Sequence, residues 1–140
     1  MTQVLYDEDF YAWTKQQASL LQAEVIEGLD LANLAEEIEA MGKGQCRELG
    51  SRLTVLLIHL LKLHFYQRQH VKNWRSAIHT QRGEIELALR NSPSLRLVLP
   101  DAIFYAYRQA CWDVARENQV AQAKFKADCP WTVEQILDED

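Results

Sequence analysis

The stretch from Leu29 to Leu63 constrains the fold of this chain more than any other part of the sequence. At about 100° per residue, most of its apolar residues fall on one side, and this spacing predicts a single long amphipathic helix. The residues on this stripe are Leu31, Leu34, Ala35, Ile38, Met41, Gly42, Gln45, Leu49, Leu53, Leu56, Leu60 and Leu63. Other helices must cover such a stripe, so the sequence predicts an all-α fold.

The second half of this helix is apolar on every side. After Leu49 the residues Val55, Leu57, Ile58 and Leu61 join the original stripe. A helix that is apolar all round is a buried helix. We therefore expect the segment from Leu53 to Leu63 to lie at the centre of a helical bundle.

Two glycines, Gly42 and Gly44, fall in the middle of the long helix. Glycine weakens a helix interior by up to about 1 kcal/mol relative to alanine, so a kink is one interpretation. Because Gly42 lies on the apolar stripe, the alternative is that it admits a closely packed neighbouring helix.

The first helix is expected before the long one. Asp7 or Asp9 can cap its N-terminus, and its apolar periodicity runs to about Ala23. Gly28 then marks a turn, and Asp30 is placed to cap the long helix.

The remaining helices follow the long one. The polar segment Gln67–Asn73 predicts a connection, and a third helix ends at Asn91. The fourth helix runs to about Asn118 and either is capped by Ser94 and kinked at Pro100 or begins cleanly at Pro100.

A short last helix is signalled by Thr132-x-x-Gln135, which is a capping-box pattern. The sequence thus predicts a helical bundle of four main helices plus a short C-terminal helix. With 140 residues, it predicts one domain over residues 1–140.

The charge balance disfavours some partners. The net charge is −5, which argues against nucleic acid or an anionic membrane as the main partner. The charges are unevenly placed, because residues 49–83 hold six bases and no acid. The most apolar run is too short to span a bilayer, so no membrane association is expected.

The cysteines indicate a reducing compartment. Cys46, Cys111 and Cys129 are odd in number and widely spaced, which predicts neither a disulfide framework nor a zinc site. The N-terminus is acidic where a signal peptide would be basic and then apolar. We expect a cytoplasmic protein.

Several groups of residues form a distinctive combination along nearly the whole chain: Tyr6-Asp7-x-Asp9-Phe10-x-x-Trp13, Asn33-Leu34-Ala35-Glu36-Glu37-Ile38-Glu39-x-Met41-Gly42, Arg52-Leu53, Leu56-Leu57-x-His59-Leu60-Leu61-Lys62, Trp74-Arg75, Ile78-x-x-Gln81-Arg82, Ser92-Pro93-Ser94-Leu95 and Pro130-Trp131-Thr132. With them the chain resembles a bacterial family catalogued as domain of unknown function twenty-nine. The resemblance implies an all-α bundle and no established activity, substrate or catalytic residue. Gly44-Gln45-Cys46 departs from the Ser-Glu pair expected there, so no carboxylate role is carried over to Gln45.

A polar stripe beside the core face of the long helix is the sharpest candidate site. It consists of Gln45, Glu48, Arg52 and His59, and Glu48 and Arg52 form an i,i+4 pair in the favourable order. Such a set can bind an anionic ligand through Arg52, with His59 as proton donor or acceptor. The alternative is a structural network that fixes the helix register.

No metal site or cofactor is indicated. The chain has no Glu-x-x-His motif, and His59 and His64 are five residues apart, which places them about 140° apart around a helix. The acids Glu36, Glu37 and Glu39 point to different sides, as a solvated face does.

The basic segment is a nucleic-acid candidate, because cations can contact phosphates and aromatic rings can stack on bases. Its candidate basic patch consists of Lys62, Arg68, Lys72, Arg75 and Arg82. No known reading motif accompanies it. The alternative is that these bases neutralise acidic parts of the chain across helix interfaces.

The function expected from the sequence is a small protein-interaction module that recognises another protein or a second copy of itself. The main alternative is a ligand-binding or enzymatic bundle that uses Glu48, Arg52 and His59, and a weaker one is nucleic-acid binding through residues 62–82. No phosphate loop, nucleophile elbow or zinc-protease motif is present in the sequence, and the question of an enzyme stays open.

Overall fold

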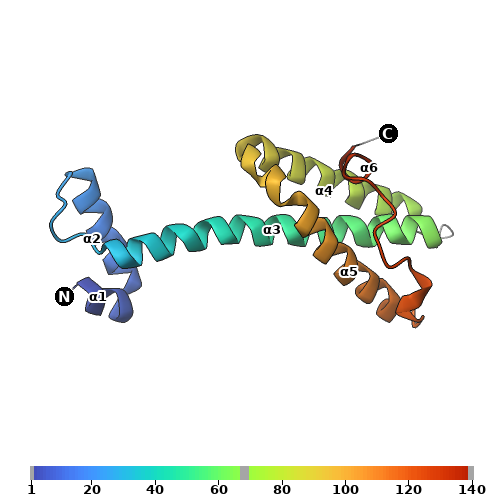
Figure 1. The fold of residues 1–140 in the computed structure, drawn as a ribbon, viewed down its shortest axis with the longest axis horizontal. Helices are drawn as coiled ribbons and strands as arrows, with labels where there is room; N and C mark the ends of the chain where they lie inside the picture. The colour runs from blue at the N-terminus through green and yellow to red at the C-terminus, as the bar shows by residue number, and fades with distance from the viewer. Residues whose placement is uncertain (1, 67–69, 139–140) are drawn as a thin grey trace. The chain divides into compact units, whose positions relative to one another are not determined.

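The computed structural model describes residues 2–66 and 70–138. Within these ranges the chain is all-α, as predicted, and holds six α-helices, two short 3-10 helices and no strand (Figure 1). The elements are α1 (Thr2–Glu8), α2 (Phe10–Gln22), α3 (Leu31–Phe65), α4 (Val71–Asn91), η1 (Pro93–Val98), α5 (Leu99–Glu117), η2 (Gln122–Lys124) and α6 (Val133–Leu137).

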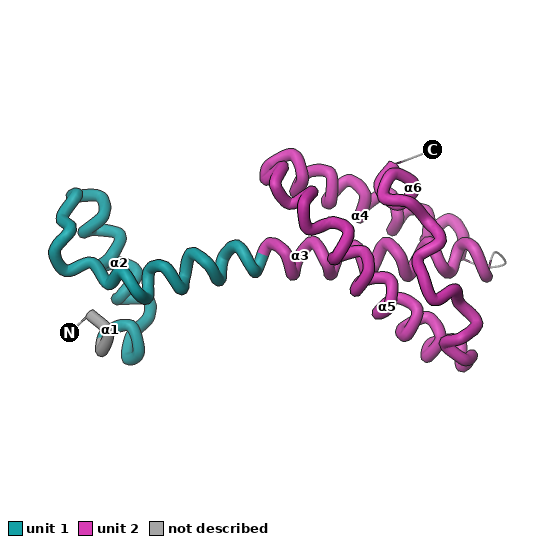
Figure 2. The backbone as a smooth tube through the Cα atoms, in the orientation of Figure 1, with its two compact units in different colours: residues 1–44 teal, residues 45–140 magenta. Residues whose placement is uncertain are grey.

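The long helix is confirmed as α3, which continues through Gly42 and Gly44 without a break. It takes part in both compact units into which the chain divides, residues 1–44 (unit 1) and residues 45–140 (unit 2) (Figure 2). The sequence predicted one domain over residues 1–140, and we describe each unit by itself.

Unit 1 contains α1, α2 and the beginning of α3. The Asp9 carboxylate accepts a hydrogen bond from the backbone N–H of Ala12 and caps α2, which ends close to the predicted Ala23. The turn to α3 needs Gly28, whose φ of +89° is a conformation that L side chains rarely adopt. Helix α1 was not predicted as a separate element.

Unit 2 holds the hydrophobic core. The segment expected at its centre supplies Leu53, Leu56, Leu57 and Leu61, all of them at most 1% exposed. Residues of α4, α5 and α6 complete the core, and they are Ile78, Ile85, Leu89, Leu99, Ile103, Ala106, Tyr107, Ala110, Cys111, Val114, Ala115 and Ile136. The bundle is therefore built around the second half of α3.

Two sequence expectations at the helix starts are decided by the structure. Helix α5 begins at Leu99 with Pro100 in its first turn, so the interpretation with a clean start is right and Ser94 does not cap it. Helix α4 begins at Val71, so the predicted connection Gln67–Asn73 was too long at its C-terminal end, and residues 67–69 lie outside the described ranges.

The apolar stripe of α3 is buried in unit 2 but open in unit 1. Leu49 and Leu53 are buried, whereas Leu31, Ile38 and Met41 are 67%, 68% and 72% exposed. The expectation that helices of the same chain cover the whole stripe was wrong for these three residues. Within unit 1, the half-buried side of α3 is formed instead by Asn33, Leu34 and Glu37.

Candidate functional site

A cavity of about 210 Å³ lies between α3 and α4 in unit 2. Three of the four residues of the predicted polar stripe line it, namely Gln45, Glu48 and Arg52. The Arg52 Nη2 atom lies 3.0 Å from Glu48 Oε1 and 3.8 Å from Glu84 Oε2. The guanidinium of Arg52 is therefore shared between carboxylates of two helices.

The pairing of two helices explains how the chain assembles this cavity. Helix α3 supplies residues 45, 48, 49 and 52, and α4 supplies residues 84, 87, 88 and 91. Each set follows the i, i+3, i+4, i+7 spacing of one helical face. Because α3 and α4 follow one another with a short connection, residues at equal distances from that connection meet. At the end of the cavity, the Ser92 hydroxyl donates to Gln45 Oε1 over 3.4 Å.

The charges around the cavity do not favour the anionic ligand that the sequence suggested. Its lining has two carboxylates, Glu48 and Glu84, and one base, Arg52. The Arg52 side chain is 31% exposed, so it already spends its charge on these neighbours while still in contact with solvent. An incoming anion would have to compete with both carboxylates.

His59 lies apart from the cavity lining. Its side chain is half-buried, and its Nδ1 atom lies 2.7 Å from the backbone carbonyl of Val55, one turn earlier in α3. This carbonyl accepts the Nδ1 proton, which fixes the tautomer with an unprotonated Nε2 in the neutral ring. The structure thus brings together Gln45, Glu48 and Arg52 and leaves His59 outside.

Sequence reasoning missed the contributions of α4, which are Glu84, Asn91 and Ser92. A signal was available. Glu84 is the first acid after the acid-free residues 49–83, and it lies about as far beyond the α3–α4 connection as Arg52 lies before it. The pairing of the two helices could therefore have suggested Glu84 as a partner of Arg52.

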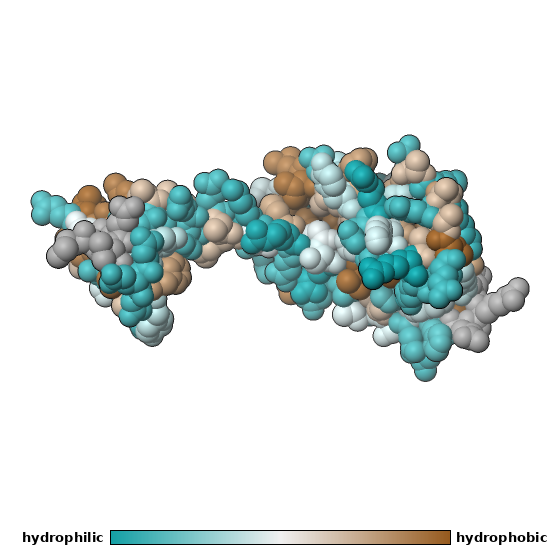
Figure 3. All heavy atoms as spheres, turned by 90° about the horizontal axis from the view of Figure 1, so that it is seen from below, coloured by the Kyte–Doolittle hydropathy of each residue, from teal (hydrophilic) through white to brown (hydrophobic). Residues whose placement is uncertain are grey.

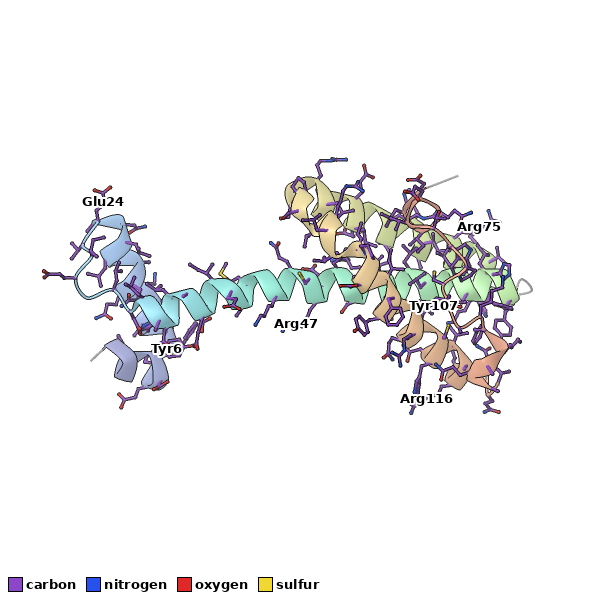
Figure 4. All side chains as sticks on the ribbon, in the orientation of Figure 1. Tyr6, Glu24, Arg47, Arg75, Tyr107 and Arg116 are labelled. Carbon is purple, nitrogen blue, oxygen red and sulfur yellow. The ribbon has the colours of Figure 1, made fainter. Side chains whose placement is uncertain are left out.

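The candidate basic patch is used largely for contacts inside unit 2. Lys62 Nζ lies 2.9 Å from Glu117 Oε2 and ties α3 to α5. Arg82 donates two hydrogen bonds to the backbone carbonyls of Gln135 and Ile136 in α6. Lys72 and Arg75 are exposed on α4 (Figure 4), and Arg68 lies outside the described residues. Nucleic-acid binding by this segment stays a prediction.

Unit 1 carries an apolar surface that no other part of the same unit covers (Figure 3). Its one buried apolar side chain among the described residues is Trp13. Its exposed large apolar residues are Phe10, Tyr11, Leu21, Val25, Ile26, Leu31, Ile38 and Met41. On α3, the exposed residues Leu31, Ala35, Ile38, Met41 and Gly42 form what we call the open face.

Two further site types were searched for in the described ranges. Among residues 2–66 and 70–138, no group of three or more His, Cys, Asp or Glu side chains is arranged to hold a metal ion. None of the helices in the same ranges combines the length and apolarity that crossing a membrane requires.

The comparison with known proteins gives a family and no function. No curated protein matches the chain, and no solved structure matches it. The model of the family described as domain of unknown function DUF29 matches residues 5–140, which is nearly the whole chain. The chain belongs to this family of helical proteins of unknown function.

Proposed function

We propose that this chain is a protein-interaction module whose binding surface is the open face of α3. The observation that carries the proposal is the exposure of Leu31, Ile38 and Met41, at 67%, 68% and 72%. Contiguous apolar residues of this size are rare on the surface of a protein that acts alone and are typical of interaction sites.

The small core of unit 1 supports the same conclusion. A unit of 44 residues that buries one apolar side chain gains little free energy from its own packing. Burial of apolar surface contributes about 25 cal/mol per Å², so a partner on the open face would add a large share of the stability of unit 1. The proposed location is the cytoplasm, because an odd, unpaired cysteine pattern is typical of reducing compartments.

The test is a photo-crosslinking amino acid placed at Ile38 in the full chain inside its host cells. We expect discrete protein adducts at this position. The matched control is the same amino acid at Leu97 in η1, which is 84% exposed but lies outside unit 1. Adducts at both positions alike, or at neither, would refute the proposal.

A second candidate function is supported by the cavity between α3 and α4. Its mixed lining of Leu49, Leu87, Arg52, Glu48 and Glu84 can hold a small ligand, and its charge favours an amine over an anion. The test is thermal stability of the wild type and of Glu84→Gln with panels of small amines, nucleotides, small anions and metals. We expect stabilisation by an amine that the variant loses, and no shift with any panel would rule the site out.

A further inference from the structure

The open face of α3 has the spacing of a helix-pairing seam. Leu31, Leu34, Ile38, Met41 and Gln45 follow one another at alternating intervals of three and four residues. Apolar residues at these intervals are the a and d positions of a coiled coil, in which two helices pack side by side. The contacts within unit 1 use the side with Asn33, Leu34 and Glu37, so most of this seam stays free.

Glycine at position 42 points to a close neighbour. Ala35 and Gly42 lie seven residues apart beside the seam, and both are exposed. A Cβ atom added at Gly42 would meet no atom within 4 Å, so packing inside the chain does not require a glycine there. Because glycine weakens a helix interior, its presence fits a second helix that approaches the backbone from outside.

The charges at the borders of the open face select the partner. Glu39 and Lys43 lie on one border, 3.4 Å apart and each 69% exposed, and Glu37 lies on the other. If two copies of α3 meet antiparallel, with the twofold axis near residues 40 and 41, each Glu39 faces the Lys43 of the other copy, and Ile38 faces Gly42. A parallel pair would instead place Glu39 against Glu37.

We infer that a second copy of this chain covers the open face, through antiparallel pairing of the α3 segment 31–44. This inference rests on the proposed function and names its partner. The segment is about 21 Å long at 1.5 Å per residue, so the interface is smaller than the standard 800 Å² per partner and the dimer is weak. The dimer is isologous, because each copy supplies the same surface.

The first experiment is sedimentation equilibrium of the purified full chain from about 1 µM to 1 mM, the range in which weak interfaces associate. We expect a monomer–dimer equilibrium that Ile38→Asp weakens by at least about tenfold. Leu97→Asp, at an exposed position of η1, is the matched control and should dimerise like the wild type. A monomer at every concentration would overturn the inference.

Gly42→Leu separates pairing from folding. In the free chain the new side chain meets open space and favours the helix, so the melting temperature of the variant at a concentration where it is monomeric should not fall. In the dimer it occupies the position of the facing helix, so association should weaken by at least about tenfold. A dimer as strong as the wild type would contradict the inference.

The charge pair gives a test of the partner itself. Glu39→Lys and Lys43→Glu should each dimerise more weakly than the wild type, and an equimolar mixture of the two should associate more strongly than either alone. A mixture that behaves as the average of its components would contradict antiparallel pairing.

The crosslinking experiment at Ile38 distinguishes the two levels of the argument. Adducts between two copies of the chain support both the proposed function and the inference. Adducts only to a different protein support the proposed function and refute self-pairing, whereas the absence of adducts refutes the proposed function as well.

Discussion

Asp30 joins three segments of unit 1 through one side chain and its backbone. Its Oδ2 atom accepts hydrogen bonds from the Trp13 indole over 3.1 Å and from the Asn33 side chain over 2.8 Å. Its backbone N–H donates to Gln17 Oε1 over 2.8 Å. The hydrogen bonds from Asn33, and then the one from Trp13, lower the pKa of Asp30 because they favour the charged carboxylate, whereas desolvation acts in the opposite direction.

The lowered pKa predicts how unit 1 responds to acid. A carboxyl group with a lower pKa in the folded state adds stability above its unfolded pKa of about 4, and this stability is lost as the pH falls through the folded value. We therefore expect the Trp13 indole N–H resonance to report opening of unit 1 below about pH 4. In Asp30→Asn this dependence should be much weaker, and an unchanged acid response would contradict the role of Asp30.

Tyr6 forms a second polar link in unit 1 (Figure 4). Its hydroxyl donates a hydrogen bond to Glu37 Oε1, and this raises the pKa of Tyr6 to about 12, because the phenolate would lose the bond and face a carboxylate. A raised pKa adds stability below the unfolded value of about 10, and this stability is lost as the pH rises through 12. We expect Tyr6→Phe to lower the alkaline sensitivity of unit 1, measured by circular dichroism between about pH 9 and 12.

The cysteines should differ in reactivity. Burial raises the pKa of the Cys111 thiol, although a hydrogen bond from Tyr107 acts in the opposite direction, and a raised pKa leaves less of the reactive thiolate. Cys46 is exposed on α3. We expect iodoacetamide to modify Cys46 at least about tenfold faster than Cys111 at pH 8, as read by peptide mass spectrometry. Equal rates would show that α5 opens on the time scale of the reaction.

At the scale of an element, α6 is too short to be stable alone and depends on its anchors. The capping box between Thr132 and Gln135 closes its N-terminus, as the sequence predicted. Ile136 is fully buried, and Arg82 on α4 binds two carbonyls at the end of the helix. These contacts cross between segments more than fifty residues apart.

Removal of the Arg82 side chain should release α6. Hydrogen bonds to a charged donor are worth about 1.5–3 kcal/mol each when buried and less at the surface, so we expect Arg82→Ala to lower the free energy of unfolding by about 1–3 kcal/mol. Arg90→Ala on the same helix, which loses one exposed pair with Glu86, should cost less than about 0.5 kcal/mol. Urea denaturation of both variants measures the difference, and equal costs would show that Arg82 is not an anchor.

The elements show what sequence reasoning can and cannot reach. The long helix, the caps at Asp30 and Thr132 and the buried segment from Leu53 to Leu63 were predictable, because they depend on local patterns. The exposure of Ile38 was not, because a helical stripe indicates which side is apolar and not what covers it.

The candidate site follows the same rule. Gln45, Glu48 and Arg52 lie on one helix, and their periodicity placed them together correctly. The contribution of Glu84 depends on how α3 and α4 align, which is a tertiary property. His59 was misplaced because helical angle alone does not reveal that the Val55 carbonyl holds its ring.

At the scale of the whole molecule, the two units differ in how much they bury. Unit 2 holds the hydrophobic core, whereas Trp13 is the one apolar side chain buried in the described part of unit 1. Units with few buried apolar contacts open with a lower free energy than the rest of a protein. We expect hydrogen exchange of the α2 amides to be at least about tenfold faster than that of the core turn 53–61 of α3. Equal protection would indicate that residues 1–140 unfold as one domain.

The continuity of α3 also sets an order of events during synthesis. Residues 1–44 leave the ribosome before the 96 residues of unit 2, and at about 5–20 residues per second those take roughly 5–20 s. Until then the packing that holds α3 helical does not exist, because its buried half is completed by α4 and α5. The nascent N-terminal segment therefore passes through an interval in which its apolar side chains meet neither core nor partner, and where a chaperone has the first opportunity to bind them.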